Sequence, residues 1–252
     1  MGRLEERVAI VTGAAQGIGE ALARGLAAEG ARIAIADLDS GAQVVAEIQE
    51  AGGQAIDVPT DVADEESCNA MVRRTVEAFG QLDILVNNAA VFTSVERKAF
   101  TDITVAEWDQ VLAVNTKGVW LCCKAAVPEM RKNGYGKIIS LATGRIFKGA
   151  PFFLHYDASK AAVVGITRSL AREVGEDHIC VNALAPGSTL SANILKRTNW
   201  KGGGPEKTRA SRALKQDEVP EDLIGACIFF ASAESDFITG QTLVVDGGSV
   251  MH

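Results

Sequence analysis

The strongest constraint on the fold is a regular alternation of two kinds of segment along the chain. Short runs rich in Val, Ile and Leu are separated by longer segments with helical periodicity. The short runs are apolar on both faces, so both sides must be covered, as happens when crossover helices flank a parallel sheet. We therefore expect an α/β fold with a doubly wound, seven-stranded parallel sheet as the middle of three layers. The expected strands are residues 8–11, 32–36, 55–58, 84–86, 137–141, 180–184 and 243–245.

The intervening helices and one irregular segment complete this expected architecture. A chain of 252 residues fits the range that α/β sheets fill as one unit, so we expect a single domain over residues 1–252. Residues 188–216 break the alternation, with three glycines and Pro205 among many cations. They follow the sixth expected strand, where open α/β sheets bind ligands, and are expected to form a substrate lid. The expected helices are residues 18–29, 42–51, 65–79, 105–114, 116–132, 158–175 and 221–231.

Composition excludes several classes of partner. A net charge of −7 argues against general nucleic-acid binding, which depends on clustered cations. No apolar run approaches the roughly 20 residues needed to span a bilayer, and the first residues lack a secretory signal. A cytoplasmic protein with small-molecule partners is expected. The five cysteines show no metal or redox spacing and are expected to be reduced and buried, and three scattered histidines predict no metal site.

The first expected strand leads directly into a glycine-rich turn, Thr12-Gly13-Ala14-Ala15-Gln16-Gly17-Ile18-Gly19, which opens a helix. Gly13 permits a tight turn, Gly17 lets the backbone approach a pyrophosphate, and Gly19 lets the helix pack closely. The alternative is an ordinary glycine-rich turn. In this context the turn predicts a Rossmann-like dinucleotide site, with Gly13, Gln16, Gly17, Ile18 and Gly19 as cofactor-binding residues.

Asp37 ends the second expected strand and indicates which dinucleotide binds. A carboxylate at this point accepts hydrogen bonds from the adenosine ribose hydroxyls and repels a 2′-phosphate. No Arg or Lys directly follows Asp37 or stands between Gly13 and Gly17, so groups that would neutralise the phosphate of NADP are missing. The sequence therefore predicts NAD as the cofactor. The alternative for Asp37 is a turn or helix-capping residue.

Further motifs extend over nearly the whole chain, in an order and at spacings that resemble the short-chain dehydrogenase/reductase family. The glycine turn is followed by Asp61-Val62, Asn87-Asn88-Ala89-Ala90, Pro186-Gly187 and Asp246-Gly247-Gly248. The chain is similar to bacterial NAD-dependent secondary-alcohol dehydrogenases of this family. By resemblance, Asp61-Val62 holds the adenine, the residues after Pro186-Gly187 hold the nicotinamide carboxamide, and Asp246-Gly247-Gly248 belongs to the tail of the chain. Ala90 replaces the family's glycine. The cofactor contacts implied are Asp61, Val62, Asn87, Pro186, Gly187, Thr189 and Ser191, together with Tyr156 and Lys160.

Tyr156 and Lys160 are four residues apart, so on a helix both lie on one face. A nearby ammonium and the positive nicotinamide ring favour the phenolate and would draw the pKa of Tyr156 down from about 10. Tyr156 could then act as general base on an alcohol, or as acid in the reverse direction, while Lys160 orients the nicotinamide ribose. A surface pair of the same spacing is the alternative.

Two further catalytic residues are implied by the resemblance. The family's catalytic serine, which donates a hydrogen bond to the reacting oxygen, corresponds here to Thr143, which keeps the hydroxyl and adds a stiffening methyl group. Ser140 is expected to project elsewhere. Asn115 matches the asparagine that holds a water joining Lys160 to solvent, with a helix-packing amide as the alternative.

The expected rim of the substrate pocket is basic. Arg145 lies two residues beyond Thr143 and is predicted, with Thr143 and Tyr156, to bind substrate; a solvated surface or subunit contacts are the alternative. The other cations are Arg97, Lys98, Lys148, Lys196, Arg197, Lys201, Lys207, Arg209, Arg212 and Lys215.

These residues predict an NAD-dependent oxidoreductase that moves a hydride between NAD(H) and a secondary alcohol, ketone or sugar hydroxyl. The basic rim allows a substrate with a carboxylate, phosphate or sulfonate. An NADPH-dependent ketoreductase and a catalytically weak NAD-binding sensor or scaffold remain alternatives, the latter because of Thr143 and Ala90. The family resemblance also implies a homotetramer.

Overall fold

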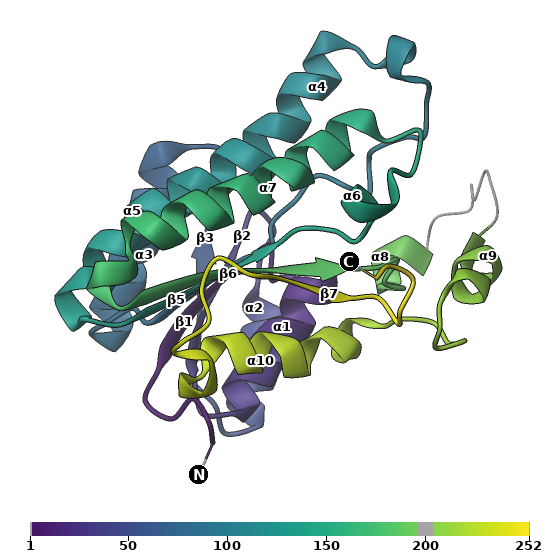
Figure 1. Ribbon diagram of the computed structural model, residues 1–252. Coiled ribbons are helices and arrows are strands. Elements are labelled where there is room, and N and C mark those ends of the chain that lie inside the picture. The colour runs from purple at the N-terminus through teal and green to yellow at the C-terminus, as the bar shows by residue number, and fades with distance from the viewer. Residues whose placement is uncertain (1, 196–203, 252) are drawn as a thin grey trace.

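The computed structural model describes residues 2–195 and 204–251, and in them seven strands form one parallel sheet (Figure 1). The strand order is β3-β2-β1-β4-β5-β6-β7, so the direction of winding reverses between β1 and β4. The expected Rossmann-like, doubly wound α/β fold is therefore confirmed. The strands are β1 (Val8–Thr12), β2 (Arg32–Asp37), β3 (Ala55–Pro59), β4 (Ile84–Asn87), β5 (Gly136–Leu141), β6 (Ile179–Pro186) and β7 (Thr242–Val245).

Helices cover both faces of the sheet because the strand side chains alternate between two apolar clusters. Ile10 of β1 packs on one side, whereas Ala9 and Val11 pack on the other. One cluster contains apolar side chains of α3 (Glu65–Phe79), α5 (Gly118–Asn133) and α7 (Leu154–Glu173). The opposite cluster contains those of α1 (Gly17–Ala28), α2 (Ala42–Glu50) and α10 (Ile224–Ala231), and Figure 1 shows the two sets on opposite sides of the sheet.

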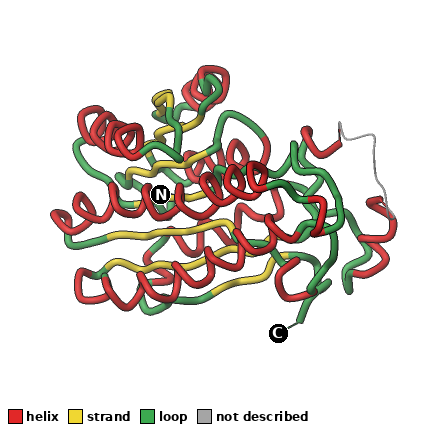
Figure 2. The backbone as a smooth tube through the Cα atoms, turned by 90° about the horizontal axis from the view of Figure 1, so that it is seen from above, coloured by secondary structure: helices red, strands yellow, loops and turns green. Residues whose placement is uncertain are grey.

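The parallel register brings the carboxyl ends of the strands to one edge. Thr12 pairs with Ala36, and Val11 with Val86, so β1, β2 and β4 end together. Figures 1 and 2 agree in placing α8 (Ala192–Leu195) and α9 (Gly204–Ser211) at that end of the molecule. Ligands of open α/β sheets bind at such an edge, beside the point where the winding reverses.

Several elements differ from the expectation. Helix α7 begins at Leu154, four residues before the expected start, because the aromatic residues ahead of it pack against the site. The expected helix 221–231 starts as a 3-10 turn, Pro220–Leu223. The expected irregular lid contains α8 and α9 in its described part; α9 accepts Pro205 because a proline in the first helical turn loses no hydrogen bond.

The fourth and fifth expected helices are joined rather than separate. Helix α4 (Val105–Leu112) continues through a π-helical turn, Ala113–Lys117, into α5. The N–H of Gly118 reaches the carbonyl of Ala113, five residues back, as a π-helical turn requires. In the described part of the chain no helix is long and apolar enough to cross a membrane. All five cysteines are buried and free, as expected.

Candidate active site

Steric limits on three glycines set the shape of the turn between β1 and α1, which we call the glycine turn (residues 12–19). Gly13 has a φ of +64°, which favours glycine, and a Cβ there would lie 2.7 Å from Cα of Ala89. A Cβ on Gly19 would lie 2.2 Å from the carbonyl oxygen of Gly13. A Cβ on Gly17 would lie 3.7 Å from Cβ of Ser191. The turn therefore presents bare backbone at the start of α1, where free N–H groups attract an anion.

Asp37 and the pair Asp61-Val62 lie beside the glycine turn. The Asp37 carboxylate accepts a hydrogen bond from the N–H of Ala15 at 2.9 Å, so it joins the end of β2 to the turn. The segment after β3 is tied to the same place, since the N–H of Thr60 donates to the Asp37 carbonyl at 2.7 Å. Val62 packs closely against Gly118. Through Asp37, Thr60 brings the next residues, Asp61 and Val62, toward the glycine turn.

The two asparagines at the end of β4, Asn87 and Asn88, have different roles. Asn87 directs its Nδ2 into the protein, toward Ser140 Oγ at 3.1 Å and Cys123 Sγ at 3.4 Å. Asn88 Nδ2 donates to the carbonyls of Thr12 and Gly13, both at 2.9 Å. Asn88 therefore fixes the glycine turn, a role that the sequence analysis missed although the residue stands in the same motif.

Tyr156 and Lys160 both point from α7 into the buried interior. Lys160 Nζ donates to the carbonyl of Leu141 at 2.6 Å, at the end of β5. Burial lowers the pKa of Lys160 to about 8. Burial also raises the pKa of Tyr156, and the nearby charge of Asp157 acts in the same direction, whereas Arg145 and a hydrogen bond with Thr143 oppose it. In the protein alone the pKa of Tyr156 is therefore raised, and the lowering expected from Lys160 together with the positive nicotinamide ring stays a prediction for the complex.

Thr143 lies against Tyr156, whereas Ser140 does not. The buried Thr143 hydroxyl is a hydrogen-bond partner of the Tyr156 phenol and accepts a hydrogen bond from the backbone N–H of Arg145 at 3.3 Å. Ser140 instead accepts from Asn87. The side chain of Arg145 makes a two-pronged contact with Asp157, through Nε at 2.9 Å and Nη2 at 3.0 Å. Arg145 thus bridges the segment of Thr143 and the helix of Tyr156.

Asn115 occupies the π-helical turn and is fully buried. Its Oδ1 accepts from the N–H of Val91 at 2.8 Å, and its Nδ2 donates to the carbonyl of Val91 at 3.2 Å. Nδ2 also lies 3.1 Å from Ser159 Oγ on α7. The side chain thereby holds the segment after β4 against α7, beside Tyr156 and Lys160.

Comparison with known proteins identifies the family of this chain. The profile of the family described as enoyl-(acyl carrier protein) reductase matches residues 13–250. A short-chain dehydrogenase/reductase of Hericium erinaceus is 40% identical over 248 residues, which cover 96% of each chain. The chain belongs to the short-chain dehydrogenase/reductase family.

Two solved structures show how closely this dehydrogenase/reductase shares the family fold. A 3-ketoacyl-(acyl-carrier-protein) reductase of Brucella melitensis, complexed with NADH, has a TM-score of 0.90 and 32% identity, covering 98% of this chain and 100% of the other. A protein of Beutenbergia cavernae assigned as an NAD(P)-dependent gluconate 5-dehydrogenase, with NADP at low occupancy, has a TM-score of 0.88 and 35% identity, covering 98% and 97%. The chain is an oxidoreductase that acts on hydroxyl groups, in a family that binds nicotinamide cofactors.

The residues of this dehydrogenase/reductase fit such a cofactor. Bare backbone at Gly13 and Gly17 leaves room for a pyrophosphate at the start of α1, and Ser191 faces that turn across a short gap. The expected adenosine contacts lie at one edge of the sheet. The buried Tyr156 and Lys160 lie at the same edge, on the other side of the glycine turn. A dinucleotide that crosses the glycine turn would reach both.

An aromatic wall behind Tyr156 was missed by the sequence analysis. The rings of Phe92 and Tyr156 have centroids 4.7 Å apart, and Phe153 lies 6.0 Å from Phe92. Arg97 and Arg145 stack over the ring of Phe153, at 5.6 Å and 4.8 Å. A phenol packed on an aromatic ring has limited freedom to turn, so its oxygen is held in one direction.

Four of the eight described cations of the expected basic rim form ion pairs. Besides Arg145 with Asp157, three of its cations form ion pairs, since Lys98 binds Glu107, Arg209 binds Asp217 and Arg212 binds Glu218. Arg212 is also buried rather than on a rim. The acids come from segments outside the runs of cations, which is why the sequence pattern overstated the local charge. Lys196, Arg197 and Lys201 lie outside the described residues.

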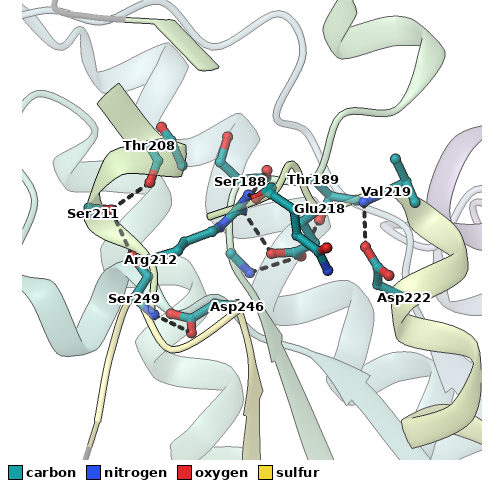
Figure 3. A network of polar contacts seen from close by, with 12 residues as sticks. Ser188, Thr189, Thr208, Ser211, Arg212, Glu218, Val219, Asp222, Asp246 and Ser249 are labelled. Carbon is teal, nitrogen blue, oxygen red and sulfur yellow. Dashed lines mark hydrogen bonds and ion pairs between the residues drawn. The ribbon is translucent and has the colours of Figure 1, made fainter. Parts of the chain in front are cut away.

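The turn after β6, which we call the Pro186 turn (residues 186–189), is held by its neighbours. The N–H of Gly187 donates to the carbonyl of Val245 at 3.1 Å and to Glu218 Oε1 at 3.1 Å. The Thr189 hydroxyl donates to the same carboxylate oxygen at 2.7 Å (Figure 3). Glu218 and Arg212 carried no distinctive spacing in the sequence, so only the structure reveals this support.

Proposed function

We propose that the chain is an NAD-dependent dehydrogenase, one catalytic unit over its whole length, that transfers a hydride between NAD(H) and a secondary alcohol, ketone or sugar hydroxyl. The observation that carries the proposal is that Thr143 is a hydrogen-bond partner of Tyr156, with both side chains buried. A phenol and a hydroxyl that meet there can both bind one substrate oxygen. Oxidation of an alcohol needs both a base for the hydroxyl proton and a donor that steadies the oxygen.

The residues would share the proton chemistry as follows. NAD would supply the acceptor for the hydride. Tyr156 takes the proton of the substrate hydroxyl through Oη, and Thr143 donates a hydrogen bond to the same oxygen. Lys160, with a pKa lowered to about 8, can release or accept a proton near working pH, while Asn115 holds the backbone beside it. The positive ring of the bound cofactor would favour the phenolate that burial disfavours.

NAD rather than NADP is proposed because of Asp37. Its carboxylate lies beside the glycine turn, where a 2′-phosphate would meet a negative charge. Members of this family use either cofactor, since the Brucella melitensis structure holds NADH and the Beutenbergia cavernae structure holds NADP. An NADPH-dependent ketoreductase would be supported instead if NADP bound more tightly.

Absorbance of the reduced cofactor tests the proposal directly. The protein is mixed with NAD or NADP and a panel of neutral and anionic alcohols and sugar acids, and the formation of NADH or NADPH is followed. Turnover with NAD and a hydroxyl substrate is expected. Tight NADH binding without turnover across a broad panel would favour the sensor or scaffold, and turnover confined to NADP would reject the choice of cofactor.

A carboxylated, phosphorylated or sulfonated substrate is a narrower proposal, in which Arg145 would bind the anion. The name of the Beutenbergia cavernae protein, which refers to a sugar acid, favours it. The ion pair with Asp157 opposes it, since the anion would have to compete with that carboxylate. If the proposal holds, Arg145→Ala should raise KM by about one to two decades, and added salt should raise it too. A neutral best substrate with a salt-independent KM would reject it.

A homotetramer is proposed from the family resemblance, with α5 and α7 in contact with a neighbouring subunit. Light scattering should give a mass of four chains. A mass equal to one chain would reject any assembly.

A further inference from the structure

A buried ion pair lies beneath the Pro186 turn. Arg212, just after α9, places Nη2 3.0 Å from Glu218 Oε2, and both side chains are at least 95% buried. Desolvation of two charges offsets most of their attraction, so a buried pair contributes little net stability. Its chief effect is to fix the positions of the groups that it touches.

The pair contacts each of three successive residues of the turn (Figure 3). Glu218 Oε1 accepts hydrogen bonds from the Gly187 N–H at 3.1 Å and from the Thr189 hydroxyl at 2.7 Å. Arg212 Nη2 donates to the carbonyl of Ser188 at 3.0 Å. A Cβ on Gly187 would lie 2.5 Å from Glu218 Oε2, so the carboxylate sits directly against the backbone.

The charge of Glu218 determines which way the Thr189 hydroxyl points. Burial raises the pKa of the Glu218 carboxyl, whereas the Thr189 hydrogen bond and the charge of Arg212 oppose this rise. As the ionised partner of Arg212, the carboxylate can only accept hydrogen bonds, so Thr189 donates its single hydrogen to it. The remaining lone pairs of the Thr189 oxygen can then only accept. A ligand that approaches Thr189 must therefore offer a donor such as an N–H.

We propose that Glu218 and Arg212 are positioning residues for the nicotinamide carboxamide, because they fix Thr189 as an acceptor for its N–H. The inference rests on the proposed function and on the family resemblance, which implies that the Pro186 turn meets the nicotinamide carboxamide. A carboxamide has one donor end and one acceptor end, so an obligate acceptor at Thr189 selects the amino end. The rotation of the carboxamide about its bond to the ring is thereby fixed.

The test compares NADH with reduced 3-acetylpyridine adenine dinucleotide, which has a methyl ketone in place of the carboxamide and offers no N–H. Calorimetric titration gives the Kd of each without any substrate. The parent protein should prefer NADH by about two- to tenfold, the effect of one neutral hydrogen bond. In Glu218→Gln, Arg212 holds the amide oxygen of the glutamine, so the amino group of the glutamine faces Thr189. Thr189 then accepts a hydrogen bond from that amino group and can donate its own hydrogen to the cofactor. The preference for NADH should then fall to about one or reverse.

Asp217→Asn is the matched control. Asp217 is the neighbouring residue and also pairs with an arginine, Arg209, at 3.0 Å, but this pair is only partly buried and makes none of the contacts with the turn. The control should keep the parental preference. General loosening of the segment would weaken both dinucleotides equally in either variant and leave the ratio unchanged.

A second pair of variants separates positioning from folding. Thr189→Val removes the acceptor and should abolish the preference, and adding Glu218→Gln to it should change the ratio no further. If Glu218→Gln does not fold, Arg212→Lys takes its place, since Lys keeps the charge but cannot hold Ser188 and Glu218 together; the preference should fall part of the way.

Each outcome decides between the inference and the proposed function. A parental ratio in folded Glu218→Gln or Arg212→Lys, or an equal loss in Asp217→Asn, overturns the inference alone. Tighter binding of NADPH than NADH overturns the choice of NAD but leaves the inference standing, because NADPH carries the same carboxamide as NADH. The comparison is then made between NADPH and the 2′-phosphorylated form of the reduced 3-acetylpyridine analogue. Failure to bind either dinucleotide overturns both.

Discussion

In the region that we propose binds the adenosine, the adenosine half of the site (the glycine turn with Asp37, Asp61 and Val62), the shape depends on backbone that lies too close to allow side chains. In the region that we propose carries the reaction, the reacting half (Thr143, Tyr156, Lys160 and the Pro186 turn), the shape depends on side chains that hold one another. A Cβ on Gly19 would lie 2.2 Å from a carbonyl oxygen, whereas Thr189 is fixed by a hydrogen bond to Glu218. Substitutions that add volume should therefore damage the adenosine half. Substitutions that change hydrogen bonding or charge should damage the reacting half.

The largest effect is expected from Tyr156→Phe in the reacting half. The ring and its contact with Phe92 remain, and only the oxygen that carries the proton is lost. Turnover should fall by about 10³-fold or more, within the range that general acid–base catalysis supplies. Steady-state rates and an NADH titration check this, and the Kd should stay within a few-fold of the parent. Activity close to the parent would show that another base operates.

Thr143 offers a graded test of the same half. Thr143→Ala removes the hydroxyl that contacts the phenol, and kcat should fall by about 10²-fold, as when one donor to a developing oxyanion is lost. Thr143→Ser keeps the hydroxyl and should remain active. Comparison of kcat for the alanine and serine variants separates the effect of losing the hydroxyl from the effect of losing the methyl group. Full activity of the alanine variant would reassign the donor role, with Ser140 the next residue to replace.

Gly19→Ala should break the adenosine half by volume alone. The added methyl group meets the Gly13 carbonyl and the Asn88 amide, so we expect a loss of about 1–3 kcal/mol in the free energy of unfolding, together with weaker NADH binding. Urea denaturation measures the first effect and titration the second. Gly225→Ala is the control, since a Cβ there meets nothing within 4 Å, and alanine suits helix α10 by about 0.5–1 kcal/mol. Equal stability in the two variants would contradict the steric argument.

Asp37→Ala should give the smallest change and affect selectivity rather than turnover. Without the carboxylate, NADP loses a repulsion and NAD loses acceptors for its ribose hydroxyls, so the ratio of their kcat/KM values should shift toward NADP by about tenfold or more. The Ala15 N–H also loses its partner, which should slightly lower Tm. An unchanged ratio would assign Asp37 to holding the turn alone.

The same contrast explains which features could be predicted from sequence. The strands, the glycine turn and Asp37 follow from local patterns, because backbone geometry and glycine placement are written in consecutive residues. The start of α7 was missed because packing of Tyr156 on Phe92 outweighs the weak helical signal of the residues before it. The partners of Arg145 and Arg212 were missed because a run of cations does not show which acids fold against it.

The π-helical turn between α4 and α5 makes the site sensitive to the number of residues as well as to their identity. Each residue turns a regular α-helix by about 100°, so deletion of one residue from Ala113–Lys117 would let α4 and α5 run on as one regular helix. Asn115, or whichever residue took its place, would then point away from Val91 and Ser159 even with every other residue intact. An alignment gap at this position would therefore indicate a lost site in a relative that keeps the tyrosine and the lysine.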